Sequence, residues 1–110
     1  MGLDIRFIHQ KAVICPHCGE VVSHQHIREM SSSGRAWYPF LKSIGYYVPY
    51  EERTKEHDWY AKDMILTSEQ MLEACAFIRE NYDLYNANDI HGLIASAIVS
   101  GEGIAVNADW

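Results

Sequence analysis

The sequence has few of the features that mark secreted, membrane or DNA-binding proteins. Only three of its 110 residues are cysteine, too few for a disulfide framework, and two of these are the closely spaced Cys15 and Cys18. No apolar run approaches the roughly 18 residues that cross a membrane. An acid stands early, at Asp4, and no apolar stretch follows, so we expect no secretory signal. These absences predict a cytoplasmic protein, kept in a reducing compartment, with no membrane contact.

Basic residues are also scarce. Nine lysines and arginines face 15 acids, which leaves a formal net charge of −6. A phosphate backbone repels an acidic chain, so general nucleic-acid binding is disfavoured. The charge is uneven, however: residues 1–45 carry a net +2 and residues 46–110 a net −8. A local nucleic-acid contact by the N-terminal part therefore stays open, although a solvated acidic face explains the charge more simply.

One short stretch organises the rest of the chain. The apolar run Ala12-Val13-Ile14 leads into Cys15-Pro16-His17-Cys18-Gly19, and a second apolar pair, Val21-Val22, leads out. Two cysteines on a tight turn that ends in glycine are typical of a zinc knuckle, because glycine accepts the positive φ that such a turn needs. The sequence therefore predicts Zn²⁺ as the cofactor of this chain.

Zinc takes four tetrahedral ligands, so two more are needed. Two histidines that follow the knuckle, His24 and His26, are two residues apart and project to one face of a strand, which favours a site made of Cys15, Cys18, His24 and His26. Three other histidines remain alternatives for the last ligands: His9, His57 and His91. His17, inside the turn, is expected to point outward.

Two enzymatic interpretations compete with a structural zinc site. The tetrapeptide from Cys15 to Cys18 resembles the active site of periplasmic thiol oxidases, and this resemblance implies Cys15 as the nucleophile and Cys18 as the resolving thiol. Gly19 stands where the helix of those enzymes begins, which speaks against it. A small metal-dependent hydrolase using His24 and His26 is the other alternative, although no His-Glu-x-x-His pairing is present.

The remaining pattern predicts an α+β fold in one domain over residues 1–110. Alternating apolar residues predict a strand from Leu3 to His9, a turn at Gln10-Lys11, and a knuckle hairpin over residues 9–30. Ser31 to Gly34 is expected to be a loop, and Ala36 to Gly45 a short helix with Pro39 in its first turn. Ile104 to Val106 is expected to be the last strand. The sheet should be small and antiparallel, with two or three helices on one face.

The helical part is expected over residues 67–101. Thr67 and Gln70 have the spacing of a capping box, and the helix they open should run to about Asn81 or Tyr82. Its apolar stripe is expected to consist of Met71, Cys75, Ile78 and Tyr82, with Cys75 as a buried, inert thiol. Asn88 is the expected N-cap of the next helix, which Gly101 should end and whose stripe reaches Ile98.

Aromatic residues gather between positions 37 and 60. They are Trp37, Tyr38, Phe40, Tyr46, Tyr47, Tyr50, Trp59 and Tyr60. They favour a core role, since one buried ring replaces several aliphatic contacts, while a binding groove remains the alternative.

Taken with the acidic second half, the Cys-Pro-x-Cys-Gly motif makes this chain similar to small zinc-knuckle accessory proteins of bacteriophages and prophages. The resemblance rests on the N-terminal third. It implies a non-enzymatic, zinc-stabilised module that binds a partner protein, for example as an antagonist of a host factor. The sequence leaves the identity of that partner and the oligomeric state open.

Overall fold

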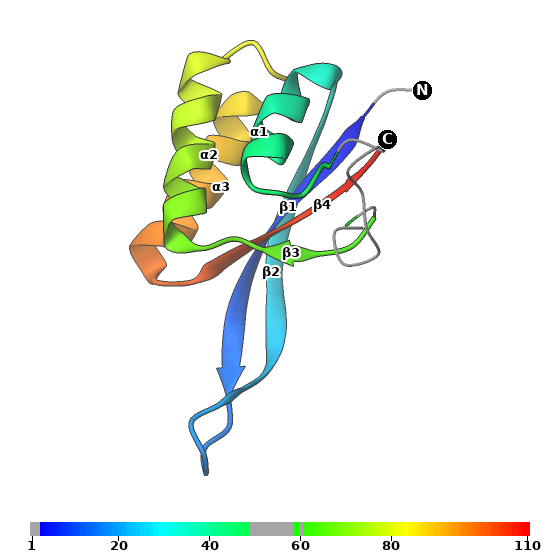
Figure 1. The fold of residues 1–110 in the computed structure, drawn as a ribbon. Coiled ribbons are helices and arrows are strands. Elements are labelled where there is room, and N and C mark those ends of the chain that lie inside the picture. The colour runs from blue at the N-terminus through cyan, green and yellow to red at the C-terminus, as the bar shows by residue number, and fades with distance from the viewer. Residues whose placement is uncertain (1–2, 49–58, 60) are drawn as a thin grey trace.

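The computed structural model describes residues 3–48, 59 and 61–110. Within them, four strands form one antiparallel sheet in the order β2-β1-β4-β3, and its helices lie together on one side of it (Figure 1). The strands are β1 (Asp4–Ile14), β2 (Val21–Ser33), β3 (Met64–Ile65) and β4 (Gly103–Asp109). The helices are the 3-10 turn η1 (Arg35–Trp37), α1 (Tyr38–Ser43), α2 (Ser68–Glu80) and α3 (Ala87–Ser100). The α+β prediction is confirmed.

The core lies between the helices and one face of the sheet. Alternation along β1 and β4 points Phe7 and Val106, which are cross-strand partners, into this layer, where both are fully buried. Helix α3 contributes Ile90, Leu93 and Ile94, each at most 1% exposed. A continuous apolar face on α3 therefore docks on the two central strands.

The predicted turn at Gln10-Lys11 is wrong, because β1 continues without a break to Ile14. The apolar-polar alternation of the sequence breaks at Gln10, which suggested a turn. In the structure the strand continues through this break, because the pairing of β1 with β2 shifts in register between His9 and Gln10. Gln10 remains paired on both sides, with His26 of β2 and Gly103 of β4, so its backbone stays in the sheet.

The loop predicted from Ser31 is also wrong, because β2 extends to Ser33 and pairs with the start of β1. The hydroxyl of Ser32 is buried there: it accepts a hydrogen bond from the indole N–H of Trp37 at 2.9 Å and donates to the carbonyl oxygen of Tyr85 at 2.6 Å. Tertiary partners thus keep a serine-rich segment in a strand.

The capping box at the start of α2 is confirmed. Gln70 donates its backbone N–H to the Thr67 hydroxyl at 3.1 Å, and Thr67 donates its own to the Gln70 side chain at 2.9 Å. Cys75 is buried on the inner face, as predicted. Tyr82 is 80% exposed, contrary to its predicted place on the stripe, because α2 ends before it and the helical period no longer applies.

Helix α3 begins earlier than predicted. Its N-cap residue is Asn86, in the left-handed region at φ 58°, and not Asn88. Ile98 is 38% exposed, so the inner stripe ends at Ala97, one residue sooner than expected. The predicted end at Gly101, with φ 69°, is confirmed.

Part of the aromatic segment belongs to the core, while Tyr38, Tyr47 and Trp59 are half-buried and pack against it. Trp37, Phe40 and Tyr46 are at most 2% exposed, in and beside the predicted short helix. The Tyr46 hydroxyl lies 2.7 Å from the carbonyl oxygen of Lys62 and accepts the backbone N–H of Ala108 at 2.8 Å. Tyr50 and Tyr60 lie outside the described residues.

The hairpin extends well beyond the sheet. Strand β4 stops pairing with β1 at Gln10, whereas β1 and β2 stay paired as far as Ile14 and Val21. The chain from Lys11 to Ile27 is therefore a two-stranded ribbon with a turn at its end, and it projects from the body in Figure 1. We call this segment the ribbon. No helix among the described residues combines the length and apolarity of a membrane span.

Candidate metal centre at the tip of the ribbon

Cys15 and Cys18 lie on the turn that closes the ribbon. The turn is held by a hydrogen bond from the Cys15 N–H to the Glu20 carbonyl at 2.8 Å and another from the Gly19 N–H to the Cys15 carbonyl at 2.9 Å. Gly19 has φ 73°, a conformation that side chains with a Cβ rarely adopt. The local sequence therefore folds into the tight turn that the knuckle motif predicted.

The turn also points backbone N–H groups at a thiol. Hydrogen bonds from the backbone N–H of Cys18 and of His17, together with the Cys18 side chain, lower the pKa of the Cys15 thiol. The same bonds would stabilise a thiolate that binds a metal. The cysteine half of the predicted zinc site thus has a suitable geometry and donor chemistry.

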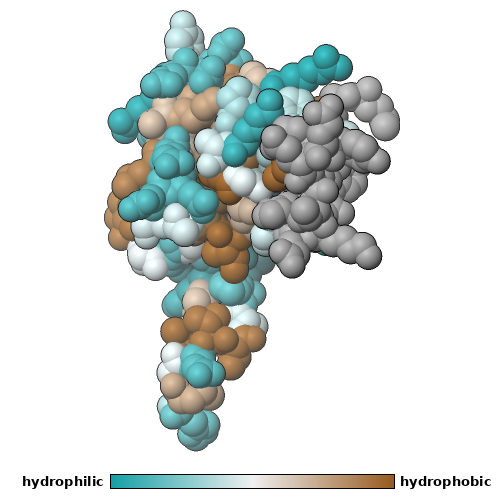
Figure 2. Space-filling model, viewed as in Figure 1, coloured by the Kyte–Doolittle hydropathy of each residue, from teal (hydrophilic) through white to brown (hydrophobic). Residues whose placement is uncertain are grey.

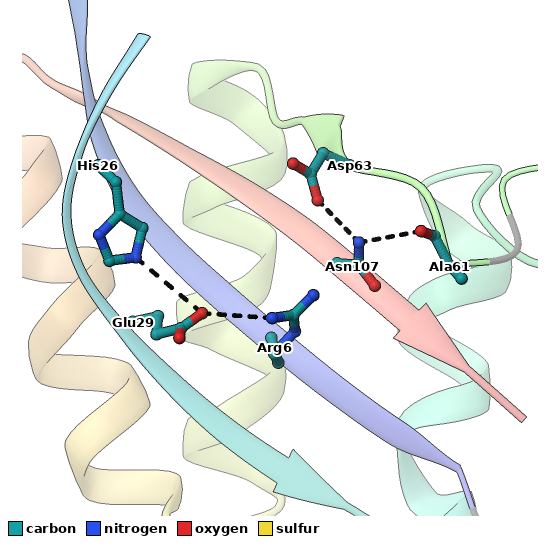
Figure 3. Close-up of polar contacts among 6 residues, drawn as sticks. All are labelled: Arg6, His26, Glu29, Ala61, Asp63 and Asn107. Carbon is teal, nitrogen blue, oxygen red and sulfur yellow. Dashed lines mark hydrogen bonds and ion pairs between the residues drawn. The ribbon is translucent and has the colours of Figure 1, made fainter.

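The predicted histidine ligands lie further back along the ribbon. His24 pairs with Ala12 and His26 with Gln10, which places them roughly 10 Å and 16 Å from Cys15 at about 3.3 Å per residue. Ligand atoms of one zinc ion lie within about 4 Å of each other. His26 instead lies 4.0 Å from the Glu29 carboxylate, which in turn is 3.6 Å from Arg6 (Figure 3).

The alternative histidine ligands are elsewhere as well. His9 is buried and its Nε2 atom lies 3.0 Å from Glu102. His91, on α3, accepts a hydrogen bond from Arg79 at 3.3 Å, and His57 lies outside the described residues. His17 is exposed on the turn, as expected. Among the described residues, no three His, Cys, Asp or Glu side chains gather closely enough to hold a metal ion.

Two of the four predicted ligands, Cys15 and Cys18, therefore lie together, and the structure does not bring His24 and His26 to them. The four-ligand site within one chain stays a prediction. Nothing else in the described part of the ribbon supplies a third donor beside the two thiols.

Apolar side chains flank the cysteine pair, and their pattern in the sequence predicted strands only. Four of them are exposed between 39% and 64%: Val13, Ile14, Val21 and Val22. The space-filling view shows apolar surface on the projecting ribbon (Figure 2). The clue to an interaction surface in the sequence was the group of β-branched residues on both sides of the cysteine turn.

The sheet face away from the helices is polar near the other end of the hairpin. Asn107 donates to the Asp63 carboxylate at 2.8 Å and to the Ala61 carbonyl at 3.1 Å, which ties β4 to the segment before β3 (Figure 3). Asp63 is thereby part of a structural contact and lies far along the fold from the cysteine turn.

A second apolar surface lies between α2 and α3. This groove is lined by Leu72, Cys75, Ala76, Ile98 and Val99, with Arg79 and His91 at its polar end. Burial raises the pKa of the Cys75 thiol, which the charge of Arg79 only partly offsets. Cys75 is thus the one buried cysteine of the three, in the position predicted for a core cysteine.

Neither a family model, nor a curated protein, nor a solved structure matches this chain.

Proposed function

We propose that this chain is a non-enzymatic, zinc-stabilised protein-binding module whose interaction element is the ribbon. One observation carries the proposal: the ribbon leaves the sheet and presents a cysteine pair beside exposed apolar side chains. The resemblance to phage-type accessory proteins supports the same function, including an antagonist of a host protein as one form of it.

The energetics of the ribbon support a binding role. A two-stranded ribbon without a third strand or a packed face is marginally stable in water. From Lys11 to Ile27 every residue of this ribbon is exposed or half-buried. A metal at the tip would hold the two strands together, and a partner would cover the apolar side chains that the fold leaves in solvent.

The ribbon also suits a protein partner electrostatically. Residues 9–30 contain two basic residues, Lys11 and Arg28, and two acidic ones, Glu20 and Glu29, so this segment is neutral when its histidines are neutral. A neutral, partly apolar surface is typical of the centre of a protein interface, whereas nucleic-acid contacts need an excess of cations.

The experiment is zinc analysis on protein purified without added metal, combined with thiol titration before and after chelation. Bound zinc, with Cys15 and Cys18 reactive only after chelation, is the expected result. A partner captured by the wild type and lost with C15S/C18S, but not with C75A, would support the binding role. Absence of zinc would contradict it.

The exposure and spacing of the two thiols favour a second candidate, thiol–disulfide exchange. In that reaction Cys15 attacks a substrate disulfide, releasing one thiolate, and Cys18 resolves the mixed disulfide. The substrate gains the two electrons that the pair loses. A metal-free protein whose Cys15–Cys18 disulfide forms and breaks reversibly would establish this activity and replace the zinc module.

A further inference from the structure

The tip of the ribbon holds half of a zinc site. Cys15 and Cys18 lie on one turn, which is held by the hydrogen bonds from the Cys15 N–H to the Glu20 carbonyl and from the Gly19 N–H to the Cys15 carbonyl. A structural zinc site needs four ligands, and within the described residues no third donor stands beside these two. A second turn of the same kind would supply the two that are missing.

We propose that the second turn comes from another copy of this chain, so that Cys15 and Cys18 of two protomers bind one Zn²⁺ tip to tip. The inference rests on the proposed zinc-binding function and names the partner and the stoichiometry. A two-fold axis through the metal turns two ligands into four and closes the assembly as a dimer. The four thiols release four protons, and the resulting centre carries a formal charge of −2.

The position of the turn makes this contact sterically open. The turn ends the projecting ribbon (Figure 1). Pro16, His17 and Cys18 on this turn are exposed. A cysteine pair in a cleft or on a flat sheet face would not let two copies approach so closely. Here nothing in the described body lies beside the tip.

Exposed apolar residues extend the contact on both sides of the metal. Val21 and Val22 are 52% and 64% exposed, and Ile14, the cross-strand partner of Val21, is 55% exposed. Tip-to-tip pairing would bury these side chains twice, once in each protomer. The contact stays small by the standards of stable dimers, so it should depend on the metal.

Charge favours a contact through the tips over one through the bodies. Residues 61–110 carry two basic and eight acidic residues, a net −6, whereas the hairpin over residues 9–30 is neutral. The five steps along the strand from Gln10 to Cys15 extend the ribbon by roughly 16 Å, so two ribbons hold the sheets roughly 30 Å apart. This exceeds the Debye length of about 8 Å at physiological ionic strength, so the acidic bodies repel each other little.

The test is a zinc titration of the metal-free full chain, followed by light scattering and elemental analysis, with a thiol-free reductant present throughout. We expect a monomer without metal and a dimer with one zinc per two chains, which a chelator returns to the monomer. Cobalt in place of zinc should give the absorption of a tetrahedral centre with four thiolates. Far-UV circular dichroism shows whether the body stays folded throughout.

Matched variants identify the ligands. C15S/C18S should abolish the zinc-dependent dimer, while H24A/H26A should leave both dimer and stoichiometry unchanged. V22S should weaken dimerisation by about tenfold or more, because the symmetry removes the side chain twice. V99S removes a valine of α3 that is still more exposed, at 88%, and should have no effect.

Other outcomes would overturn the inference in distinguishable ways. One zinc per monomer, lost in H24A/H26A, would refute the dimer and leave the proposed zinc module intact with the histidines as ligands. A dimer that survives chelation would refute metal bridging. A chain that binds no zinc would refute both the inference and the function on which it rests.

Discussion

The imidazole Nε2 of His9 lies 3.0 Å from the Oε1 atom of Glu102, with the His9 side chain 5% exposed and that of Glu102 20% exposed. This contact joins β1 to the turn before β4, close to the point where β4 begins and the ribbon leaves the sheet. The other ring nitrogen, Nδ1, is buried without a hydrogen-bond partner. Among the described residues, Glu102 therefore provides the one polar contact of the His9 ring.

Replacement of Glu102 by alanine should destabilise the protein. It leaves both ring nitrogens of His9 buried without a partner, which costs about 1–3 kcal/mol of unfolding free energy. Urea denaturation followed by tryptophan fluorescence measures this. Glu73 is an exposed glutamate on α2, and E73A is the control that should change stability little. Equal effects of E102A and E73A would show that the His9 contact contributes nothing.

Ser32 should be the one serine of its run that matters for stability. S32A removes the acceptor of the buried Trp37 indole N–H and should cost about 1–3 kcal/mol. S31A, which alters an exposed hydroxyl on the neighbouring position, should stay within about 0.5 kcal/mol of the wild type. Thermal or urea unfolding of both variants decides the matter, and a neutral S32A would contradict the prediction.

Stability should fall in alkali because of Tyr46. Burial, as the main cause, raises the pKa of its hydroxyl above the ordinary value of 10.0. The folded state therefore holds the proton where the unfolded state loses it. The contribution of the protonated Tyr46 hydroxyl to the free energy of unfolding is complete below about pH 10. It is lost as pH rises through the pKa that this hydroxyl has in the folded state.

Urea unfolding at a series of alkaline pH values measures this decline. Y46F should reduce the pH dependence, although it also removes the acceptor of the Ala108 N–H and lowers stability at neutral pH. Y82F, at an exposed tyrosine, should keep the alkaline decline of the wild type. An unchanged decline in Y46F would assign the effect to other groups.

The three thiols should separate into two classes. Once metal is removed, Cys15 and Cys18 should react with iodoacetamide at pH 8 well before Cys75, because burial shields that thiol and raises its pKa. Mass spectrometry of the alkylated peptides assigns the sites. Urea should abolish the difference, and a Cys75 that reacts as fast as the other two in the folded protein would contradict its buried position.

Local chemistry made several elements predictable. The Thr67 capping box and the terminal Gly101 depend on residues within one helical turn, so they can be read from the sequence. The cysteine turn is equally local, because Gly19 and the two thiols lie within five residues of each other. These elements are confirmed, while the metal that the turn predicts stays a prediction.

Elements that depend on distant partners were less predictable. The two-residue strand β3 is too short for any periodicity, and it exists because Met64 and Ile65 pair with Val106 and Ala105. The strand extension through Ser32 rests on contacts with Trp37 and Tyr85, the latter 53 residues away. Neither the Trp37 indole nor the Tyr85 carbonyl is adjacent to the serines in sequence, so turn propensity alone indicated a loop.

The sequence by itself determined the α+β class, the two long helices and the cysteine turn, because helix periodicity, caps and turn glycines act over a few residues. Only the tertiary structure decided that the turn stands at the end of an unsupported ribbon. The ribbon begins where β4 stops pairing with β1, and the last pair there is Gln10 with Gly103. These two residues lie near opposite ends of the chain, so no local sequence pattern indicates their pairing. The tertiary structure also decided that His24 and His26 lie further back along the ribbon than Cys15 and Cys18, because they pair with Ala12 and Gln10.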